Sequence, residues 1–417
     1  MKFIQASDLH IDSPLRGLDK YEDAPAEMIR SATRDAFENL VDLAIDEKVE
    51  FVILSGDLAD GDWKNTQTML WLNGQFRRLE EDGIQVYTIR GNHDAQNNLS
   101  KSITLAGNVH EFPKNPHTFK DPKGRYAIHG QSYPSREVKD NLVKDYPEAI
   151  DGMFNIGMLH TNLLGSSEHA NYAPTTMDEL LAKGYDYWAL GHVHNKAIVH
   201  EYPHIIYPGN TQGRNIRETG ERGCFQVSVD EDYKSNIEFV PLQVVRWEKV
   251  WVESDPDDGV VEILNKVRSV LKEIVSNMDD NLTVVRVIIH GPNREYGRLE
   301  SPNGLEELRN SIRDIANSSS SPIWIEKIKV ELKAPIDIEA LKKSDTLLGD
   351  LLRLTEEIGN NPESLKDLVS KDIASFREKA ALEIEKTEKN LDNIDLLKYH
   401  LERAESILIS YISGVGQ

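Results

Sequence analysis

The sequence predicts an α/β fold that ends in helices, and two observations lead to this prediction. In residues 1–235, short apolar runs of strand length alternate repeatedly with amphipathic segments of helix length. From about residue 335 onward, the apolar residues follow helical spacing. Strands that alternate with helices are typical of a layered α/β domain, so the first part of the chain is expected to form one.

The elements of this first domain follow from the spacing of its apolar residues. Helices are expected at 29–45, where Leu40, Leu43 and Ala44 lie near one face, and at 63–79. The expected strands are 1–8, 51–54, 84–89, 126–129, 155–159, 187–190, 205–207 and 224–229.

A second, smaller α/β domain is expected at 236–334, and a helical region at 335–417. In the smaller domain we expect strands at 244–252, 283–290 and 323–332, with helices at 260–275 and 305–316 between them. Beyond it, 338–358 has helical spacing, and a later stripe of apolar residues follows i, i+3, i+4 spacing: Ile394, Leu397, Leu401, Ala404, Leu408 and Ile412. The stripe has two interpretations, because it could pack on the chain's own domains or dock against the helices of a partner.

Composition narrows the class of protein. The chain has 417 residues, 39% hydrophobic and 28% charged, and no apolar run long enough to span a membrane. The single cysteine, Cys224, excludes an internal disulfide, so a cytoplasmic protein is expected. The formal net charge of −22 argues against a broad electrostatic grip on DNA, although bound divalent cations would reverse the field locally.

Five motifs share one pattern, in which an apolar run is followed by polar residues that can bind a metal ion. They are FIQASDLH, with Asp8 and His10; FVILSGDLAD, with Asp57; VYTIRGNHD, with Asn92, His93 and Asp94; NIGMLHTN, with His160; and YWALGHVH, with His192 and His194. Each motif alone has a structural explanation, such as a turn or a buried histidine. Together they indicate a ligand site, because sites in open α/β sheets form at the carboxyl ends of the strands.

The residue types in these motifs favour metal-dependent chemistry on phosphate. Carboxylate oxygens and imidazole nitrogens suit Mn²⁺, Fe²⁺ or Zn²⁺, and no cysteine lies near the motifs. More ligands are present than one ion needs, so two divalent ions about 3.5–4 Å apart, bridged by one carboxylate, are expected. Such a pair binds phosphate and activates water for attack on phosphorus.

The motifs DLH, GDLAD, GNHD, LHTN and GHVH, in this order, resemble the signature of the calcineurin-like metallophosphoesterases. Within that superfamily, SDLHIDSPLRGL and GHVH followed by YPGNTQGRN look like the SbcD-like DNA repair exonucleases, particularly the YhaO-type branch. The resemblance implies a β-sandwich flanked by helices, followed by a small α/β capping domain. It also implies a partner, an SMC-like coiled-coil ATPase of the SbcC type. One departure is Leu9, where many nuclease relatives have tryptophan, and it leaves the metal ligands unaffected.

The resemblance further implies a role for each polar residue of the motifs. One metal ion is assigned to Asp8, His10, Asp57 and His194, and the second to Asp57, Asn92, His160 and His192, with Asp57 as the bridge. His93 is not a ligand in the family but assists the leaving oxygen, with Asp94 orienting it. Gly91 is expected to permit a sharp turn. Tyr133 is expected to lie behind the ligands and not to bind a metal ion itself.

Outside the motifs, Arg214 and Arg217 are the candidate contacts to DNA phosphates, because their loop is expected near the metal ions. Family members are often dimeric, so a homodimer is a further expectation. The leading prediction is a manganese-dependent nuclease that acts on DNA ends, in repair or in phage defence. Two alternatives stay open: a phosphodiesterase or phosphatase for small nucleotides, and a scaffold subunit that senses DNA ends with an inactive site.

Overall fold

The computed structural model describes residues 1–13, 25–59, 66–96, 104–163, 172–276, 281–335 and 338–368, together with eight later positions. These are Ile394, Leu397, Lys398, Leu401, Glu402, Ala404, Glu405 and Leu408. The chain divides into two compact units, Met1–Glu248 with Asp280–Val284, and Lys249–Asp279 with Val285–Gln417.

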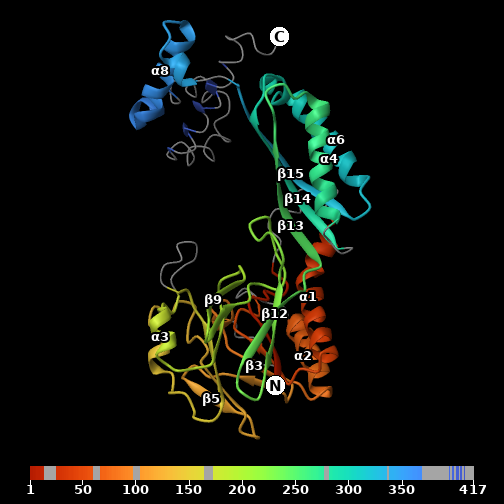
Figure 1. Cartoon of the computed structure of the whole chain (residues 1–417), viewed down its shortest axis with the longest axis vertical. Helices are drawn as coiled ribbons and strands as arrows, with labels where there is room; N and C mark the ends of the chain where they lie inside the picture. The colour runs from red at the N-terminus through yellow and green to blue at the C-terminus, as the bar shows by residue number, and fades with distance from the viewer. Residues whose placement is uncertain are drawn as a thin grey trace. The chain divides into compact units, whose positions relative to one another are not determined.

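Two six-stranded sheets form the first unit (Figure 1). The first sheet has the order β12 (Ser235–Pro241), β11 (Gly223–Val229), β1 (Lys2–Ala6), β2 (Phe51–Leu54), β3 (Gln85–Thr88) and β4 (Val109–Glu111). The second has the order β5 (His117–Lys120), β6 (Tyr126–Gly130), β7 (Phe154–His160), β8 (Tyr187–Gly191), β10 (His204–Tyr207) and β9 (Ala197–Glu201). One buried cluster joins residues of both sheets, and in it Phe3 stacks on Phe51 and meets the edge of Tyr187.

Helices and loops cover the outer faces of this sandwich. The helices α1 (Ala26–Asp46) and α2 (Thr66–Glu81) bury Phe37, Leu72 and Phe76 against the first sheet. On the second sheet, the short helices η4 (Leu142–Asp145) and α3 (Met177–Leu181) share a buried cluster with Trp188. The predicted β-sandwich flanked by helices is therefore confirmed.

Strand direction places the motifs of each sheet at one edge. The strands β1, β2 and β3 run parallel to one another, as do β7 and β8 in the other sheet. Because the carboxyl ends of parallel strands meet at the same edge, the residues that follow these strands are brought close together.

The sequence did not predict β4, β5, β9 or β12, and these are the four edge strands of the two sheets. Edge strands are only partly covered, so they lack the continuous apolar run that marks a buried strand. In β5, for example, the sequence HTFK has a single apolar residue and none of the four residues is buried. The pairing of β12 with β11 also extends the first sheet beyond residue 235, where the sequence placed the end of the domain.

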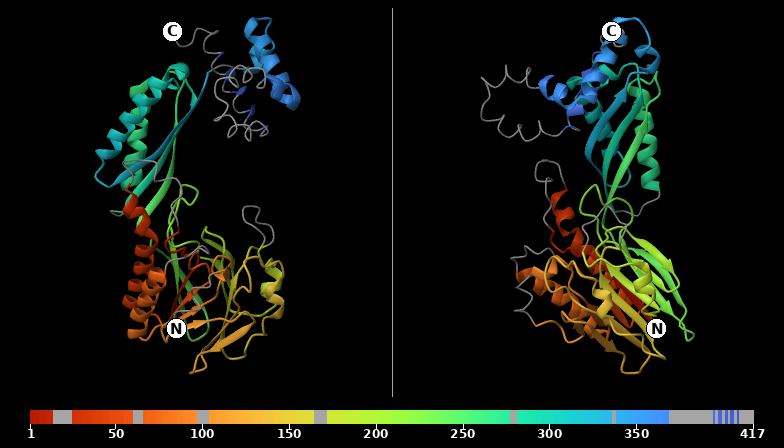
Figure 2. Two further views of the ribbon diagram at one scale, coloured as in Figure 1. Left: turned by 180° about the vertical axis from the view of Figure 1, so that it is seen from behind. Right: turned by 90° about the vertical axis from the view of Figure 1, so that its left-hand side faces the viewer.

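The second unit contains the predicted β–α–β–α–β order. Its three-stranded sheet has the order β13 (Val245–Glu253), β14 (Leu282–Pro292) and β15 (Ile323–Lys333). The helices α4 (Val260–Ser276) and α6 (Pro302–Asn317) lie on one face of this sheet (Figure 2), and a short helix α5 (Tyr296–Leu299) precedes α6. Residues of all three strands and all three helices share one buried cluster.

The predicted helical stretch at 338–358 is divided into α7 (Ile338–Lys342) and α8 (Leu347–Asn360). The division has a local cause, because the hydroxyl of Thr346 accepts a hydrogen bond from the backbone N–H of Gly349 at 3.2 Å and so begins a new helix.

The C-terminal apolar stripe packs on the chain itself at its beginning. Leu397 is buried, and the hydroxyl of Thr355 in α8 donates a hydrogen bond to the carboxylate of Glu405. The later residues Ala404 and Leu408 are exposed, and Ile412 lies outside the described residues. Among the helices that the structure describes, none is both long enough and apolar enough to cross a membrane.

Candidate metal centre

The polar residues of the five motifs come together where strands of the two sheets end. Asp8 and His10 follow β1, Asp57 follows β2, and Asn92 and His93 follow β3. From the second sheet, His160 ends β7, and His192 and His194 follow β8. Among the described residues, ligand atoms within 4.8 Å of one another occur in two groups, Asp8 with His10 and His194, and Asp8 with Asp57 and His160.

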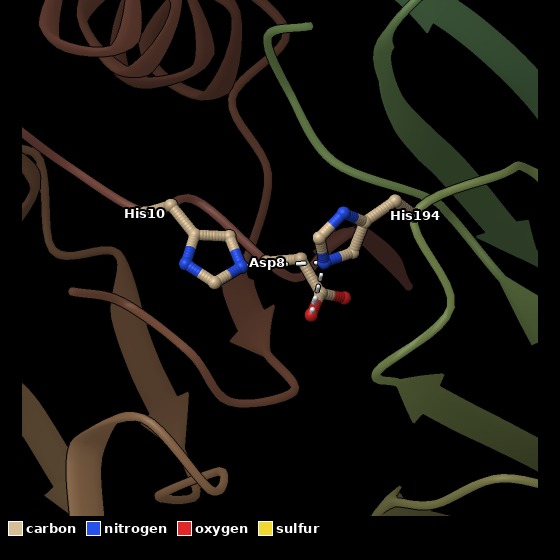
Figure 3. Close-up of side chains that lie close together, drawn as sticks. All are labelled: Asp8, His10 and His194. Carbon is tan, nitrogen blue, oxygen red and sulfur yellow. Dashed lines mark hydrogen bonds and ion pairs between the residues drawn. The ribbon is translucent and has the colours of Figure 1, made fainter. Parts of the chain in front are cut away.

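The first cluster consists of Asp8, His10 and His194 (Figure 3). The Nε2 atoms of His10 and His194 are 3.3 Å apart, and Nε2 of His194 is 3.8 Å from Oδ1 of Asp8. Two nitrogens bound about 2.1 Å from one ion lie about 3.0–3.4 Å apart in octahedral or tetrahedral geometry. The two imidazoles therefore already have the spacing of neighbouring ligands on one ion.

The second cluster consists of Asp57, Asn92 and His160, with His192 beside it. Nε2 of His160 lies 3.0 Å from Oδ1 of Asn92 and 3.3 Å from Oδ2 of Asp57. Nδ1 of His160 is 2.9 Å from the carbonyl oxygen of Ser55, so Nδ1 carries the proton and the Nε2 lone pair faces the two oxygens. Three electron-pair donors that converge on one point require a cation or a proton between them.

Without a metal ion, this cluster holds a proton on His160. Burial alone lowers the pKa of His160, but the Asp57 carboxylate outweighs burial and raises the pKa to about 9. The pKa of Asp57 is in turn held well below its usual range, because His160, His10 and His93 outweigh the effect of burial. A divalent ion would take the place of that proton, so the residues present fit a metal ion.

Asp8 supplies a second observation that fits a metal ion. Its Oδ2 accepts hydrogen bonds from the hydroxyl of Ser7 at 2.6 Å and from the backbone N–H of His192 at 3.0 Å. Its Oδ1 is buried and accepts no hydrogen bond from the described part of the chain. An unsatisfied buried carboxylate oxygen is costly, and here it faces the imidazole of His194.

Four ligand-bearing residues have left-handed backbone conformations, with φ of 53° at Asp8, 45° at His10, 53° at Asp57 and 98° at His192. Residues other than glycine rarely adopt such values, and where they do the surrounding structure must hold them. The backbone N–H groups of Asp8 and His10 donate to the carbonyl oxygens of Gly56 and Asp57, at 3.0 and 3.1 Å. The loops after β1 and β2 are thus joined side by side, which fixes the ligands before any ion binds.

Asp94 joins the loops that follow β2 and β3. Its carboxylate accepts backbone N–H groups of Leu58 and Ala59 at 3.1 Å and of Gly91 at 3.2 Å. Burial, followed by the charge of Asp57, raises the pKa of Asp94 to about 7. These hydrogen bonds show that Asp94 holds the ligand-bearing loops together. Its expected role in orienting His93 stays a prediction.

Gly91 has a second role besides the sharp turn expected of it. Its φ is not positive, so the backbone conformation does not itself require glycine. A Cβ at this position would lie 2.2 Å from Oδ1 of Asp57 and 2.8 Å from Cε1 of His160. Glycine is required because two ligands approach the backbone closely.

His93 lies beside the first cluster. Its ring meets the ring of His10 edge to face, with centroids 4.9 Å apart, and the side chain is only half-buried. Its backbone N–H donates to Oδ1 of Asp57 at 2.9 Å, which ties its position to the second cluster. The imidazole is therefore placed where it can reach a group bound at the clusters.

Glu218 is a residue of the centre that the sequence analysis did not identify. Its Oε1 lies 2.9 Å from Nδ1 of His194 and accepts a hydrogen bond from Arg214 at 2.9 Å. Burial alone raises the pKa of Glu218, but the hydrogen bond with His194 and the charge of Arg214 lower it well below the usual range. A carboxylate on the outer nitrogen fixes the tautomer and orientation of a histidine ligand. The pairing is not visible in the sequence, because Glu218 and His194 are 24 residues apart.

The two arginines expected to contact DNA have different surroundings. Arg214 is bound to Glu218 behind His194, with Nη2 only 3.3 Å from Nδ1 of that histidine. Arg217 is exposed. Tyr133 lies behind the ligands, where its hydroxyl donates to the carbonyl oxygen of His160.

Comparison with known proteins agrees with this geometry. The family model described as calcineurin-like phosphoesterase matches residues 1–196, and the model of the metallophosphoesterase YhaO middle domain matches residues 247–333. The chain is 35% identical over 330 residues to the uncharacterized metallophosphoesterase YhaO of Bacillus subtilis (strain 168), covering 78% of this chain and 80% of that protein.

More distant similarity extends to DNA repair proteins. The DNA double-strand break repair protein Mre11 of Methanopyrus kandleri is 23% identical over 296 residues, covering 64% of this chain and 62% of that protein. The solved structure of a dimetal phosphatase from Danio rerio matches 55% of this chain, with 13% sequence identity and a TM-score of 0.34. On the match to YhaO and the two family models, the chain belongs to the calcineurin-like metallophosphoesterases of the YhaO family.

Proposed function

We propose that this metallophosphoesterase is a manganese-dependent nuclease that hydrolyses phosphodiester bonds at DNA ends. The observation that carries the proposal is the convergence of carboxylate, amide and imidazole ligands in two clusters linked by Asp8 and Asp57. The similarity to proteins named Mre11 supports DNA as the substrate. Its cellular role would be DNA repair or phage defence in the cytoplasm. Its partner would be an SMC-like ATPase of the SbcC type, and the chain itself would form a homodimer.

The donor set fits a divalent transition metal, manganese among them. The clusters offer oxygen and nitrogen atoms, and the cysteine Cys224 is buried in β11, in a hydrophobic cluster that contains no ligand residue. Mixed carboxylate and imidazole sites suit manganese, iron or zinc. Asp8, His10, Asp57 and His194 would hold one ion, and Asp57, Asn92, His160 and His192 the other.

Two bound ions would supply Lewis acidity for the phosphate and lower the pKa of a water molecule. The chain's own residues supply position and proton transfer. Asp57 and Asp94 fix the three loops of the first sheet relative to one another, so the ligands need not move during the reaction. His93, half-buried beside His10, would donate a proton to the leaving oxygen.

A second candidate function is the hydrolysis of small nucleotide esters. It is favoured because several arginines are already paired with carboxylates. In the second unit, Arg286 pairs with Glu326 and Arg298 with Glu295, at 2.6 and 2.5 Å. In the first unit, Arg214 pairs with Glu218. Together with a net charge of −22, these pairs leave less positive charge for a DNA backbone.

Assays on two substrates distinguish these candidates. The purified protein is incubated with Mn²⁺ and either end-labelled duplex DNA or bis-p-nitrophenyl phosphate. We expect cleavage of the DNA, and we expect Asp8→Ala and Asp57→Ala to abolish it. Hydrolysis of the small ester alone would support the second candidate. A native protein without bound metal and without activity on either substrate would instead support the scaffold alternative.

The role of His93 is tested with a matched histidine. His93→Leu should retain metal binding and lose about 10²–10⁴-fold in turnover, which is the usual contribution of a general acid. His117→Leu changes an exposed histidine at the edge of the second sheet and should retain full activity. If His93→Leu cleaves DNA at the parental rate, the assigned proton transfer is wrong.

A further inference from the structure

Beyond the ligands of the first cluster, a group of five residues fastens the loop that carries His10. We call this group the Asp12 clamp; it consists of Asp12, Thr33, Arg34, Thr68 and Trp71. Oδ1 of Asp12 accepts from Nε of Arg34 at 2.7 Å, and Oδ2 accepts from Nη2 of Arg34 at 2.6 Å. The pair is bidentate, which fixes direction as well as distance.

Two helices contribute to the Asp12 clamp. From α1, the hydroxyl of Thr33 accepts the backbone N–H of Asp12 at 3.2 Å, next to Arg34. From α2, the buried hydroxyl of Thr68 donates to Oδ2 of Asp12, and the guanidinium of Arg34 lies 5.1 Å from the ring centroid of Trp71. Backbone and side chain of Asp12 are therefore both held by the helical layer.

The Asp12 clamp acts on a segment of unusual backbone conformation. Asp8, His10 and Asp12 all have positive φ, with 58° at Asp12. At His10 and Ile11 the backbone is bonded to the loop after β2, because the N–H of His10 donates to the carbonyl oxygen of Asp57 at 3.1 Å and that of Ile11 to the carbonyl oxygen of Leu58 at 3.0 Å. The next residue, Asp12, is bonded to α1 and to α2. An alternating left-handed segment persists only when it is held at several points.

We propose that the Asp12 clamp is a positioning device for His10, and that it sets the affinity of the first of two metal ions without contacting that ion. Both carboxylate oxygens of Asp12 are occupied by Arg34, and Oδ2 also by Thr68, so Asp12 is a positioning residue and not a ligand. The second cluster has its own supports, Ser55 behind His160 and Asp94 across the loops. The effect is therefore selective for one ion. The inference rests on the proposed two-metal function.

Asp12→Asn and Arg34→Lys test the proposal, because asparagine tolerates positive φ and lysine retains the positive charge. Neither variant preserves the charged bidentate pair. The matched control is Asp42→Asn, which removes the ion pair of Asp42 in α1 with Arg78 in α2, away from the metal centre. Thermal unfolding of all three variants shows how much each change destabilises the protein.

Two measurements on the 417-residue chain decide the outcome. In Mn²⁺ titration calorimetry, Asp12→Asn should weaken one of two binding steps by about 10–100-fold, the usual effect of losing an outer-shell partner, and leave the other unchanged. In the metal-free protein, peptides that contain residues 8–13 should exchange amide hydrogen faster in Asp12→Asn and Arg34→Lys than in Asp42→Asn.

Equal weakening of both steps, or of neither, would overturn the proposal, as would unchanged exchange at residues 8–13. If the parental protein binds no Mn²⁺, the proposed two-metal function fails. The exchange comparison in metal-free protein still tests whether the Asp12 clamp holds the loop.

Discussion

Each of two histidines at the metal centre uses one ring nitrogen to fix its position and directs the other at the ligand cluster. Nδ1 of His160 faces the carbonyl oxygen of Ser55, and Nδ1 of His194 faces Glu218. The two anchors differ in chemistry, because a backbone carbonyl only selects the tautomer whereas a carboxylate also makes the ring a stronger base. The first cluster therefore depends on a side chain that a single substitution can remove.

Glu218→Gln should weaken Mn²⁺ binding by about 10–100-fold, because the amide holds His194 less firmly and also loses the charge pair with Arg214. Glu221→Gln is the matched control, since Glu221 lies in the same loop but pairs with the partly exposed Lys196 at 2.8 Å. Titration calorimetry measures both affinities. Equal affinities for the two variants would show that Glu218 does not support the ligand.

His129 gives the stability a pH dependence that is separate from the metal ligands. Burial lowers its pKa, although the hydrogen bond with Asn155 opposes this. The unfolded chain therefore binds a proton at this histidine more readily than the folded chain does. The contribution of His129 to the unfolding free energy is fully present above about pH 6.5 and is lost as the pH decreases below it. The loss can reach about 1.4 kcal/mol for each pH unit until the folded-state pKa is passed.

His129→Gln removes this titrating group, so the metal-free variant should show a shallower fall in unfolding free energy between about pH 7.5 and pH 5.5. Urea unfolding at several pH values measures the two slopes. The substitution also changes packing, because the ring stacks on Tyr185 with centroids 4.4 Å apart, so the comparison uses slopes and not absolute stabilities. Parallel slopes in the two proteins would contradict the assignment.

At the scale of elements, the sheets bring the chemistry together because β1, β2 and β3 are parallel and end at one edge. This part of the site was predictable, since each of these strands carries buried apolar residues and is soon followed by a polar motif. The edge strand β5 was not predictable, because its sequence HTFK contains no apolar run. The role of Glu218 was not predictable either, because the fold and not the local sequence brings it to His194.

Two glycines in regular elements should respond to substitution in opposite ways. Gly191 ends β8, and a Cβ there would lie 2.1 Å from the carbonyl oxygen of Ser55, so Gly191→Ala should destabilise the protein by about 1–3 kcal/mol. Gly74 lies within α2 with no neighbour within 4 Å, so Gly74→Ala should stabilise it by about 0.5–1 kcal/mol. Chemical unfolding measures both. A stabilising Gly191→Ala would show that the backbones of β2 and β8 are not in close contact.

At the scale of the whole molecule, all the ligand residues fall in one of the two compact units, Met1–Glu248 with Asp280–Val284. The other unit has its own buried cluster, built from β13, β14 and β15 with α4 and α6. A ligand that binds only the folded form stabilises what it binds, by about 2.7 kcal/mol for one site at a concentration of 100 times Kd. Metal binding should therefore protect the two units unequally.

Hydrogen exchange with and without Mn²⁺ tests this expectation on the intact chain. Peptides from β1, β2, β7 and β8 should exchange more slowly when the metal is present, because opening of these strands releases bound ions. Peptides from α6 and β15 should change little, since their buried contacts lie within the second unit. Asp57→Ala provides the control, because its loss should remove the effect of Mn²⁺ on the first unit. Protection that spreads equally over α6 and β15 would mean that the two units open as one, and that the metal centre stabilises the entire molecule.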